Sequence, residues 1–579
     1  MTTQHTTQTL RRRFFRPRSF ALLGLALVLV AVVTVVRATD DPQQRRRDKY
    51  ENLKILSEVY DKILENYVDV LDPKEVMESA VNGMLEELDE HSNYLPKEFY
   101  EDLMMSTEGE FGGLGITINI RDHFPTVVSP IEGTPAYYMG IQGGDQIIEI
   151  EGESAYDLTS REAVEKLRGP RGSKVNIKIS RPGVAEPIPY TITRDIIKIE
   201  SVPYGFMMGD IGYVRVQNFA RTTADELREK LDELEQAGMR GLILDLRFNP
   251  GGLLGAAQAV SEIFLERGQL IVFTKGRLPE QNQSFTSRAR GDVYNKVPMI
   301  VMINHSSASA SEIVSAAIQD HDAGLVVGQT SFGKGSVQTV FRLDEYEALK
   351  LTTARYYTPS GRSIHREHKR EEQTEVAADE ELPPSHPELE AAPEQRETPR
   401  FAREKFYTDS GRVVYGGGGI TPDIEIEQEY LSDFEIAVER DGALFSWAVE
   451  YANAHQNVLQ DWRPSEAELA EFGDFLAARE NIEEYLADYD LALSDSLLDA
   501  NSAFLERGLR REVARRLHGP AAAYKVAIEA DTQLHEALDL FRQAPTLPEL
   551  LEQARKWNEE QMRLLAAEDA DKAATTTAN

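Results

Sequence analysis

The chain has 579 residues, which exceeds one hydrophobic core and predicts about three or four domains. Its formal net charge of −34 argues against nucleic-acid binding, because neutralising phosphates requires basic patches. The chain has no cysteine, which excludes disulfides, thiolate catalysis, cysteine zinc sites and a lipid anchor on cysteine.

The N-terminus is basic and leads into an apolar run. Residues 1–19 carry several arginines, and residues 20–36 are apolar on every face apart from Gly24 and Thr34. A buried core helix is a poor interpretation of a run flanked by arginines. We expect residues 1–19 to be cytoplasmic and residues 20–38 to be a transmembrane anchor or a signal peptide. Arginines at 45–47 follow the run as well, so charge counting alone leaves the orientation tied.

The next two regions differ in their periodicity. Residues 48–105 repeat apolar side chains at helical spacing and predict an N-terminal helical region. Residues 106–198 hold short β-rich runs separated by glycines, with one helix expected at Ser160–Leu167.

Residues 199–428 alternate apolar strand-like runs with helical segments, which is typical of an α/β core. Four buried strands are expected, at Ile211–Val216, Leu242–Leu246, Met299–Ile303 and Leu325–Val327. Helices are expected between them, at about 223–237, 253–266 and 309–320. Within this core, residues 366–400 are rich in Glu and Pro and predict a disordered acidic insertion. Residues 429–579 predict an acidic helical region.

A cluster of small hydroxyl residues follows the third of these strands. Residues 306–311 include four serines, at the point where the strand passes into a helix. Such a turn can hold a hydroxyl beside free backbone N–H groups. A serine in this position is more commonly an N-cap, and the cluster alone leaves both interpretations open.

A lysine between two glycines follows the fourth strand, in Gly333-Lys334-Gly335. Burial there would disfavour the ammonium form and lower the lysine pKa until the amine can act as a base. The alternative is a phosphate-binding loop. Gly328 and Gly333 fit that pattern, but Gly335 stands where Ser or Thr is required.

A Gly pair follows the second strand, in Asp245 to Gly252. A strand that ends in Gly-Gly before a helix can present backbone N–H groups to an anion or oxyanion. A dinucleotide-binding loop is the alternative, but the Gly-x-Gly-x-x-Gly spacing is missing.

Together these motifs resemble the C-terminal processing peptidases, or tail-specific proteases, which are serine peptidases of family S41, subfamily A, with a built-in PDZ domain. Ser307–Ile313 is similar to the family's nucleophile motif, Ser331–Gln338 to its lysine motif, and Asp245–Gly252 to its Gly-Gly motif. The resemblance covers about residues 50–428. It implies a multidomain α/β fold, with a ClpP/crotonase-like serine protease core, an inserted β-rich PDZ domain and flanking helical regions.

The resemblance also implies roles for single residues. Ser309 is the expected nucleophile, Lys334 the expected general base, and Gln338 the residue expected to orient that lysine. The oxyanion hole is expected from the Gly251 and Ala310 amides, with Gly252 as the alternative to Gly251.

Residues 106–198 are expected to be the PDZ domain, which would capture a substrate's apolar C-terminus as an added strand. Its carboxylate-binding loop would be Gly113, Leu114, Gly115 and Ile116. Three roles are open for Arg168: contact with the bound carboxylate, contact with the protease domain, or solvation at a helix end.

Two rival interpretations remain. One is a histidine-dependent protease, in which Asp245 or Asp320 orients His305 or His321. The other is a PDZ adaptor or chaperone-like protein whose protease domain is vestigial.

The expected partners are proteins and peptides with apolar C-termini. We expect no metal or other cofactor, and no nucleic acid. The membrane is a partner if residues 20–38 are retained, and self-association or an activator protein is left open. The expected location is extracytoplasmic, in the periplasm or cell envelope, by anchoring in the inner membrane or by export.

Overall fold

The computed structural model describes residues 42–289, 293–344, 346–366 and 403–577. The predicted basic N-terminus, the predicted anchor or signal segment, and residues 367–400 of the predicted insertion lie outside the described residues. Among the described residues, no helix is both long and apolar enough to cross a membrane.

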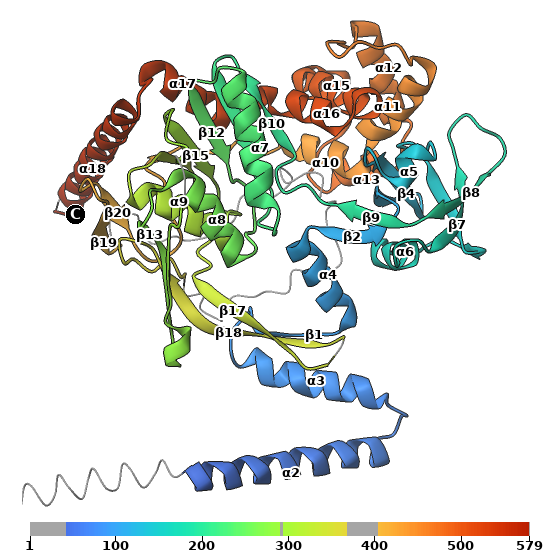
Figure 1. Cartoon of the computed structure of the whole chain (residues 1–579). Coiled ribbons are helices and arrows are strands. Elements are labelled where there is room, and N and C mark those ends of the chain that lie inside the picture. The colour runs from blue at the N-terminus through green and yellow to red at the C-terminus, as the bar shows by residue number, and fades with distance from the viewer. Residues whose placement is uncertain (1–41, 290–292, 345, 367–402, 578–579) are drawn as a thin grey trace, which may run out of the picture. The chain divides into compact units, whose positions relative to one another are not determined.

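The chain divides after Tyr94 into two compact units. The first contains α2 (Pro42–Asn66) and α3 (Pro73–Glu86) (Figure 1). Helix α3 begins after Asp72, whose carboxylate accepts a hydrogen bond of 2.6 Å from the Lys74 amide, as expected of an N-cap. Both helices leave apolar side chains exposed, so the apolar residues at helical spacing do not form a buried face within this unit. The short strand β1 (Asn93–Leu95) follows.

The second unit begins with α4 (Lys97–Glu108) and then forms a β-rich domain. Its entry and exit strands, β2 (Glu110–Gly113) and β9 (Asp195–Lys198), pair antiparallel. Between them a sheet has the strand order β3-β4-β5-β7-β8, with β6 paired to β5. The strands are β3 (Ile116–Arg121), β4 (Phe124–Pro130), β5 (Gln146–Ile150), β6 (Glu153–Ser154), β7 (Lys174–Ser180) and β8 (Ile188–Thr193). Two helices, α5 (Pro135–Tyr138) and the predicted α6 (Ser160–Leu167), complete it.

The predicted α/β core is built on a six-stranded sheet in the order β10-β11-β12-β15-β16-β21. The first strand is antiparallel to its neighbour and the other pairs are parallel. The strands are β10 (Tyr204–Met208), β11 (Ile211–Arg215), β12 (Gly241–Asp245), β15 (Met299–Ile303), β16 (Leu325–Gly328) and β21 (Ile424–Glu425). Every residue of β11, β12, β15 and β16 is buried, which explains why these strands read as continuous apolar runs.

Each face of this sheet is covered by helices (Figure 1). One face packs on α7 (Thr223–Gln236), α8 (Leu254–Phe264) and α9 (Ala310–Asp320). The other face packs on the last helices of the chain, α17 (Thr532–Gln543) and α18 (Leu547–Thr577). Leu534, Ala537 and Phe541 of α17 share one apolar cluster with Tyr213 and Ile300 of the sheet. The end of the chain is therefore a layer of the protease core.

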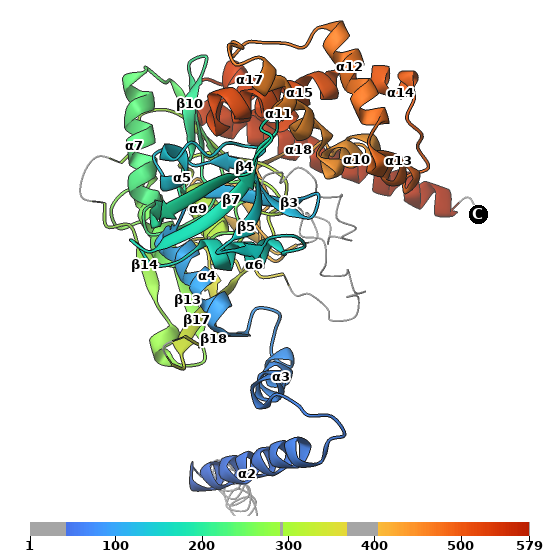
Figure 2. The same ribbon diagram turned by 90° about the vertical axis from the view of Figure 1, so that its right-hand side faces the viewer.

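The remaining elements flank this core. An antiparallel sheet has the order β17-β18-β13-β14, from β13 (Leu270–Gly276), β14 (Ser284–Thr286), β17 (Ser336–Arg342) and β18 (Ala348–Tyr357). A ribbon pairs β19 (Lys405–Tyr407) with β20 (Val413–Tyr415). Most of the helices after residue 431 build a further apolar core of their own (Figure 2). They are α10 (Asp433–Asp441), α11 (Ala443–Ala454), α12 (Glu466–Ala477), α13 (Glu480–Ala487), α14 (Asp495–Ala500) and α15 (Ser502–His518), and α16 (Pro520–Ala527) then leads to α17.

Candidate active site

Three loops with polar side chains meet at one edge of the protease sheet. They follow β12, β15 and β16, which are neighbours in the parallel part of the sheet. Because the carboxyl ends of parallel strands share an edge, the three loops lie together. Hydrogen bonds join them: the Ala308 amide donates to the Asn249 carbonyl (3.0 Å), and the Phe332 amide donates to the Ser307 carbonyl (3.0 Å). The motifs singled out from the sequence are therefore one structural cluster.

Ser309 occupies the N-cap position of α9 in a strained conformation. Its φ is 53° and its ψ is −108°, a region that residues other than glycine rarely adopt. Such outliers cluster at functional sites, where the surrounding structure holds them in place. Ser309 is half-buried, while Ala310 behind it is fully buried. The turn thus keeps one serine accessible at the start of a buried helix.

Glu312 links the serine turn to the lysine loop through hydrogen bonds to both. Its carboxylate is fully buried and accepts four hydrogen bonds. The donors are the amides of Ser309 (2.8 Å), Gly333 (2.7 Å) and Lys334 (2.9 Å) and the hydroxyl of Ser331 (2.5 Å). Burial raises the pKa of Glu312 to about 7, although the four donors oppose that shift. One carboxylate therefore sets the relative position of the two loops.

Lys334 is half-buried, between glycines that allow another segment to approach closely. A Cβ on Gly335 would lie 2.7 Å from the His365 amide nitrogen, and Gly333 has a φ of 95°. These approaches explain the Gly-Lys-Gly pattern, because a side chain at either glycine would push the loop away.

Tyr356, at the end of β18, contacts both candidate catalytic segments. Its hydroxyl donates to the Lys334 carbonyl. Burial and the nearby Glu312 carboxylate raise the Tyr356 pKa well above its ordinary value, although the Ser309 side chain acts to lower it. The phenol therefore stays protonated and can act as a donor.

The predicted oxyanion donors lie against the serine turn. A Cβ added to Gly251 would lie 2.7 Å from the Ser309 Cβ and 2.8 Å from the Ala310 nitrogen. Only glycine fits there, at a φ of 98°. In this conformation the Gly251 amide donates to Asn249 Oδ1 (2.9 Å), and the next residue, Gly252, forms a parallel bridge with Phe219. The choice between the two glycine amides stays a prediction.

Gln338 lies four residues beyond Lys334 on β17. Its amide nitrogen donates to Ser336 Oγ (2.8 Å) and Thr352 Oγ1 (3.3 Å). These two hydroxyls fix the orientation of the Gln338 side chain. Its expected contact with Lys334 stays a prediction.

The structure gives His321, Asp320 and Asp245, three residues of the histidine interpretation, other partners. His321 lies just beyond the other end of α9, 12 residues after Ser309, so the two are about 18 Å apart along the helix. Its two ring nitrogens contact Asp409 and the Leu270 carbonyl, each at 2.7 Å. Asp320 pairs with Arg362 (2.8 Å). Asp245 pairs with Arg247 (2.7 Å), so neither aspartate orients a histidine.

The predicted carboxylate-binding loop lies between β2 and β3. Gly115 has a φ of 79°, and a Cβ there would collide with Thr134, so the turn requires glycine. Leu114 is buried, and Ile116 opens β3, which stands at one end of the strand order. Gly113 ends β2 beside the Phe111 ring, where a Cβ would lie only 2.8 Å away.

Arg168 ends α6 and bridges two neighbouring elements. Its guanidinium pairs with Asp102 of α4 (2.8 Å) and lies 5.0 Å from the centre of the Phe111 ring. Of the three roles left open by the sequence, these contacts exclude a merely solvated helix end in this conformation.

Two residues of the site were not identified from the sequence. Glu312 stands at the third position of a helix that begins at a serine, a pattern that predicts an exposed capping box rather than a buried carboxylate. Tyr356 lies near the end of β18, and no role for it was expected from the sequence. Neither carried a signal of its role without the fold.

Comparison with protein families supports the grouping of these motifs. The profile "Peptidase family S41" matches residues 210–380, "PDZ domain" matches residues 126–181, and "Activating protease CtpB N-terminal domain" matches residues 30–99. The carboxy-terminal-processing protease of Bartonella bacilliformis is 42% identical over 344 residues, covering 59% of this chain and 79% of the relative. CtpA of Bacillus subtilis is 35% identical over 314 residues, covering 54% and 66%. The carboxyl-terminal-processing protease of Synechocystis sp. is 34% identical over 373 residues, covering 62% and 86%.

The S41 and PDZ matches define a serine-type peptidase that carries a peptide-binding domain, on the multidomain α/β fold predicted from the sequence. The chain belongs to the carboxy-terminal processing proteases of peptidase family S41. The predicted family, fold class and enzyme class are thereby confirmed.

Proposed function

We propose that Ser309 is the nucleophile and Lys334 the general base of this peptidase. The observation that carries the proposal is the Glu312 carboxylate, which accepts hydrogen bonds from the backbone amides of both residues. A strained serine and a half-buried lysine are thus held on one rigid support. Preorganised geometry of this kind is what nucleophilic catalysis requires.

In the proposed reaction, the neutral Lys334 amine removes the Ser309 proton while Oγ attacks the substrate carbonyl carbon. The tetrahedral intermediate collapses when the C–N bond breaks, and the Lys334 ammonium returns its proton to the leaving amine. Water, deprotonated by Lys334, then hydrolyses the acyl ester and Ser309 regains its proton.

The oxyanion is proposed to bind the Ala310 amide and one amide of the Gly251–Gly252 pair. The close packing of Gly251 on the Ala310 nitrogen supports this placement. Gln338 is proposed to accept a hydrogen bond from the Lys334 ammonium through Oε1, because its nitrogen is directed at Ser336 and Thr352.

The substrate is proposed to be a polypeptide whose apolar C-terminus adds as a strand beside β3. The position of β3 at the end of the sheet and the glycine-dependent turn at Gly115 support this mode. Arg168 is proposed to hold that loop through Phe111 and Asp102.

The chain is also proposed to act outside the cytoplasm, supported by the arginine-flanked apolar run at residues 20–36. Fusing a reporter that is active only outside the cytoplasm after residue 47 tests this, and an inactive but expressed fusion would contradict it.

Cleavage of an unfolded polypeptide tests the catalytic assignment. We expect Ser309→Ala and Lys334→Ala each to lose about 10³-fold or more of kcat/KM, with His321→Ala as an active control. Full activity of Lys334→Ala would contradict the lysine mechanism. A matched pair of peptides, one with a free C-terminal carboxylate and one amidated, tests the PDZ role, and equal affinity for both would contradict it.

A further inference from the structure

The loop proposed to hold the oxyanion needs support on two sides. It runs from Asp245, at the end of β12, to Gly252, and includes Phe248 with a φ of 56°. On the serine side, the Phe248 amide donates to Asn304 Oδ1 (2.9 Å). A strained loop persists only where its surroundings hold it, so the contacts on its other side matter equally.

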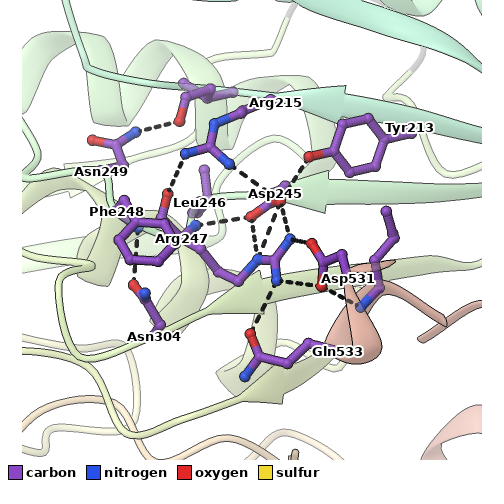
Figure 3. A network of polar contacts seen from close by, with 12 residues as sticks. Tyr213, Arg215, Asp245, Leu246, Arg247, Phe248, Asn249, Asn304, Asp531 and Gln533 are labelled. Carbon is purple, nitrogen blue, oxygen red and sulfur yellow. Dashed lines mark hydrogen bonds and ion pairs between the residues drawn. The ribbon is translucent and has the colours of Figure 1, made fainter. Parts of the chain in front are cut away.

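Arg247 provides those other contacts (Figure 3). Its side chain is buried against Asp245, with Nη2 to Oδ2 at 2.7 Å and Nε to Oδ1 at 3.0 Å. On the far side, Nη1 and Nη2 contact the two carboxylate oxygens of Asp531 at 2.9 and 2.5 Å. Nη1 also donates to Gln533 Oε1 (3.0 Å). All five guanidinium N–H groups can be satisfied by this set.

Asp531 and Gln533 belong to the last part of the chain and are themselves fixed in place. Asp531 is the N-cap of α17 and accepts a hydrogen bond from the Leu534 amide (2.9 Å). Gln533 is buried and donates to the Ile426 carbonyl (2.8 Å). The same helix packs its apolar face on the protease sheet. The arginine is therefore held by a rigid support that lies 284 residues away in the sequence.

We propose that Asp531 and Gln533 are positioning residues for the oxyanion loop, which makes the C-terminal helices part of the catalytic unit. The proposal rests on the proposed function of the Gly251–Gly252 amides. Removing the Asp531 charge leaves the buried Arg247 with one carboxylate, so its guanidinium must shift. The strained backbone beside it then relaxes. Displacement of an oxyanion donor lowers the rate of chemistry without weakening binding of the ground-state substrate.

The matched pair of variants is Asp531→Asn and Glu529→Gln. The asparagine keeps the shape and the helix cap but loses the charge. Glu529 lies two residues earlier and pairs with Arg510 (2.6 Å) rather than with Arg247. Kinetics are measured with a short peptide that does not require the PDZ domain, in the full chain. We expect Asp531→Asn to lower kcat tenfold to a hundredfold with KM within twofold, and Glu529→Gln to change both by less than twofold.

The inhibition constant of a peptide aldehyde provides a second measurement, which a general loss of stability would not change. The aldehyde's adduct with serine places an oxyanion in the hole, whereas the uncleaved peptide does not. We expect its inhibition constant to rise about tenfold in Asp531→Asn relative to Glu529→Gln, in folded protein separated by gel filtration. Unchanged kcat and unchanged aldehyde affinity in folded Asp531→Asn would overturn the proposal.

If Asp531→Asn does not fold, Gln533→Met provides the second variant, because it removes one Arg247 contact while keeping the charge pair. We expect a threefold to tenfold loss of kcat, and no loss in folded protein would overturn the proposal. Failure of the proposed function is seen separately: active Ser309→Ala would refute the nucleophile, whatever the Asp531 result.

Discussion

Two fully buried carboxylates, Glu312 and Asp245, support neighbouring parts of the site, and their pKa values shift in opposite directions. Glu312 meets only neutral donors, so burial prevails and raises its pKa to about 7. Burial acts on Asp245 as well, but the charges of Arg247 and Arg215 outweigh it and lower its pKa to about 2. The difference shows that the partners of a buried acid, rather than its depth, decide its charge. The serine turn and the lysine loop are therefore joined by an acid that titrates near neutral pH. The loop that ends at Gly251 and Gly252 is instead held by a carboxylate that stays ionised.

The largest effect is expected from Asp245→Asn. This change removes the negative charge of Asp245, with which the buried guanidinium groups of Arg215 and Arg247 are paired. Breaking a buried ion pair typically costs about 3–5 kcal/mol of unfolding free energy. Urea denaturation followed at the protease core tests this, with Asp102→Asn as an exposed-pair control. A loss below about 1 kcal/mol would mean that the charges are not coupled as the distances indicate.

Glu312→Gln should affect catalysis more than stability. A glutamine side chain directs an N–H₂ group at donors that need an acceptor, so the serine turn and the lysine loop lose their shared support. We expect kcat to fall about a hundredfold, as for loss of one well-placed catalytic contact. The control is Glu435→Gln, since Glu435 accepts from the Ser432 amide (2.8 Å) in an exposed capping box of the same kind. Equal kcat in the two variants would contradict the bridging role.

The pH dependence of stability should have opposite slopes at the two acids. The folded pKa of Glu312, about 7, exceeds the ordinary 4.5, so its contribution to stability is complete below pH 4.5 and is lost as pH rises to 7. The folded pKa of Asp245, about 2, lies below the ordinary 3.8, so its contribution is complete above pH 3.8 and is lost as pH falls to 2. Denaturation of Glu312→Gln from pH 4.5 to 7 should lack the first slope, which amounts to about 3 kcal/mol.

Activity should follow the ionised form of Glu312, because four donors surround its two oxygens. We therefore expect kcat to rise as pH increases through 7, while the contribution of Glu312 to stability falls over the same range. In Glu312→Gln the residual activity should lose that limb. A wild-type profile that is flat from pH 6 to 8 would contradict the role of the ionised Glu312 carboxylate.

The smallest effect is expected from Tyr356→Phe. It removes one hydroxyl, which donates to the Lys334 carbonyl, and leaves the Glu312 support intact. Loss of one hydrogen bond of this kind costs about 1–2 kcal/mol, or a fivefold to thirtyfold change in kcat. Tyr357→Phe, at the neighbouring residue of the same strand, is the control, and an equal change in both would assign the effect to the strand rather than to the hydroxyl.

Local patterns predicted the core of the fold well. The strands around Ile243, Val301 and Val326 are buried on both faces, so they appear as continuous apolar runs. Their parallel order then brings the loops of Ser309 and Lys334 to one edge, which is why two distant motifs could be paired. The first catalytic candidates thus followed from strand ends and small residues.

Contacts set by tertiary packing could not be predicted in this way. Asp531 reaches Arg247 only because α17 covers the second face of the sheet. The apolar stripe of Leu534, Ala537, Leu538 and Phe541 indicates a buried face on that helix, but it does not say which surface the helix covers. The four donors around Glu312 come from two separate loops, so its burial has no local signature. The orientation of Gln338 likewise depends on Thr352 of the neighbouring strand.

Mapping the adduct of a fluorophosphonate probe tests the central assignment most directly. The probe phosphonylates an activated serine, and mass spectrometry of the digested protein identifies the residue. We expect one adduct, on Ser309, in the wild-type chain and at least a hundredfold slower labelling of the same residue in Lys334→Ala. An adduct on another serine, or equal labelling rates in both proteins, would contradict Ser309 as the nucleophile that Lys334 activates.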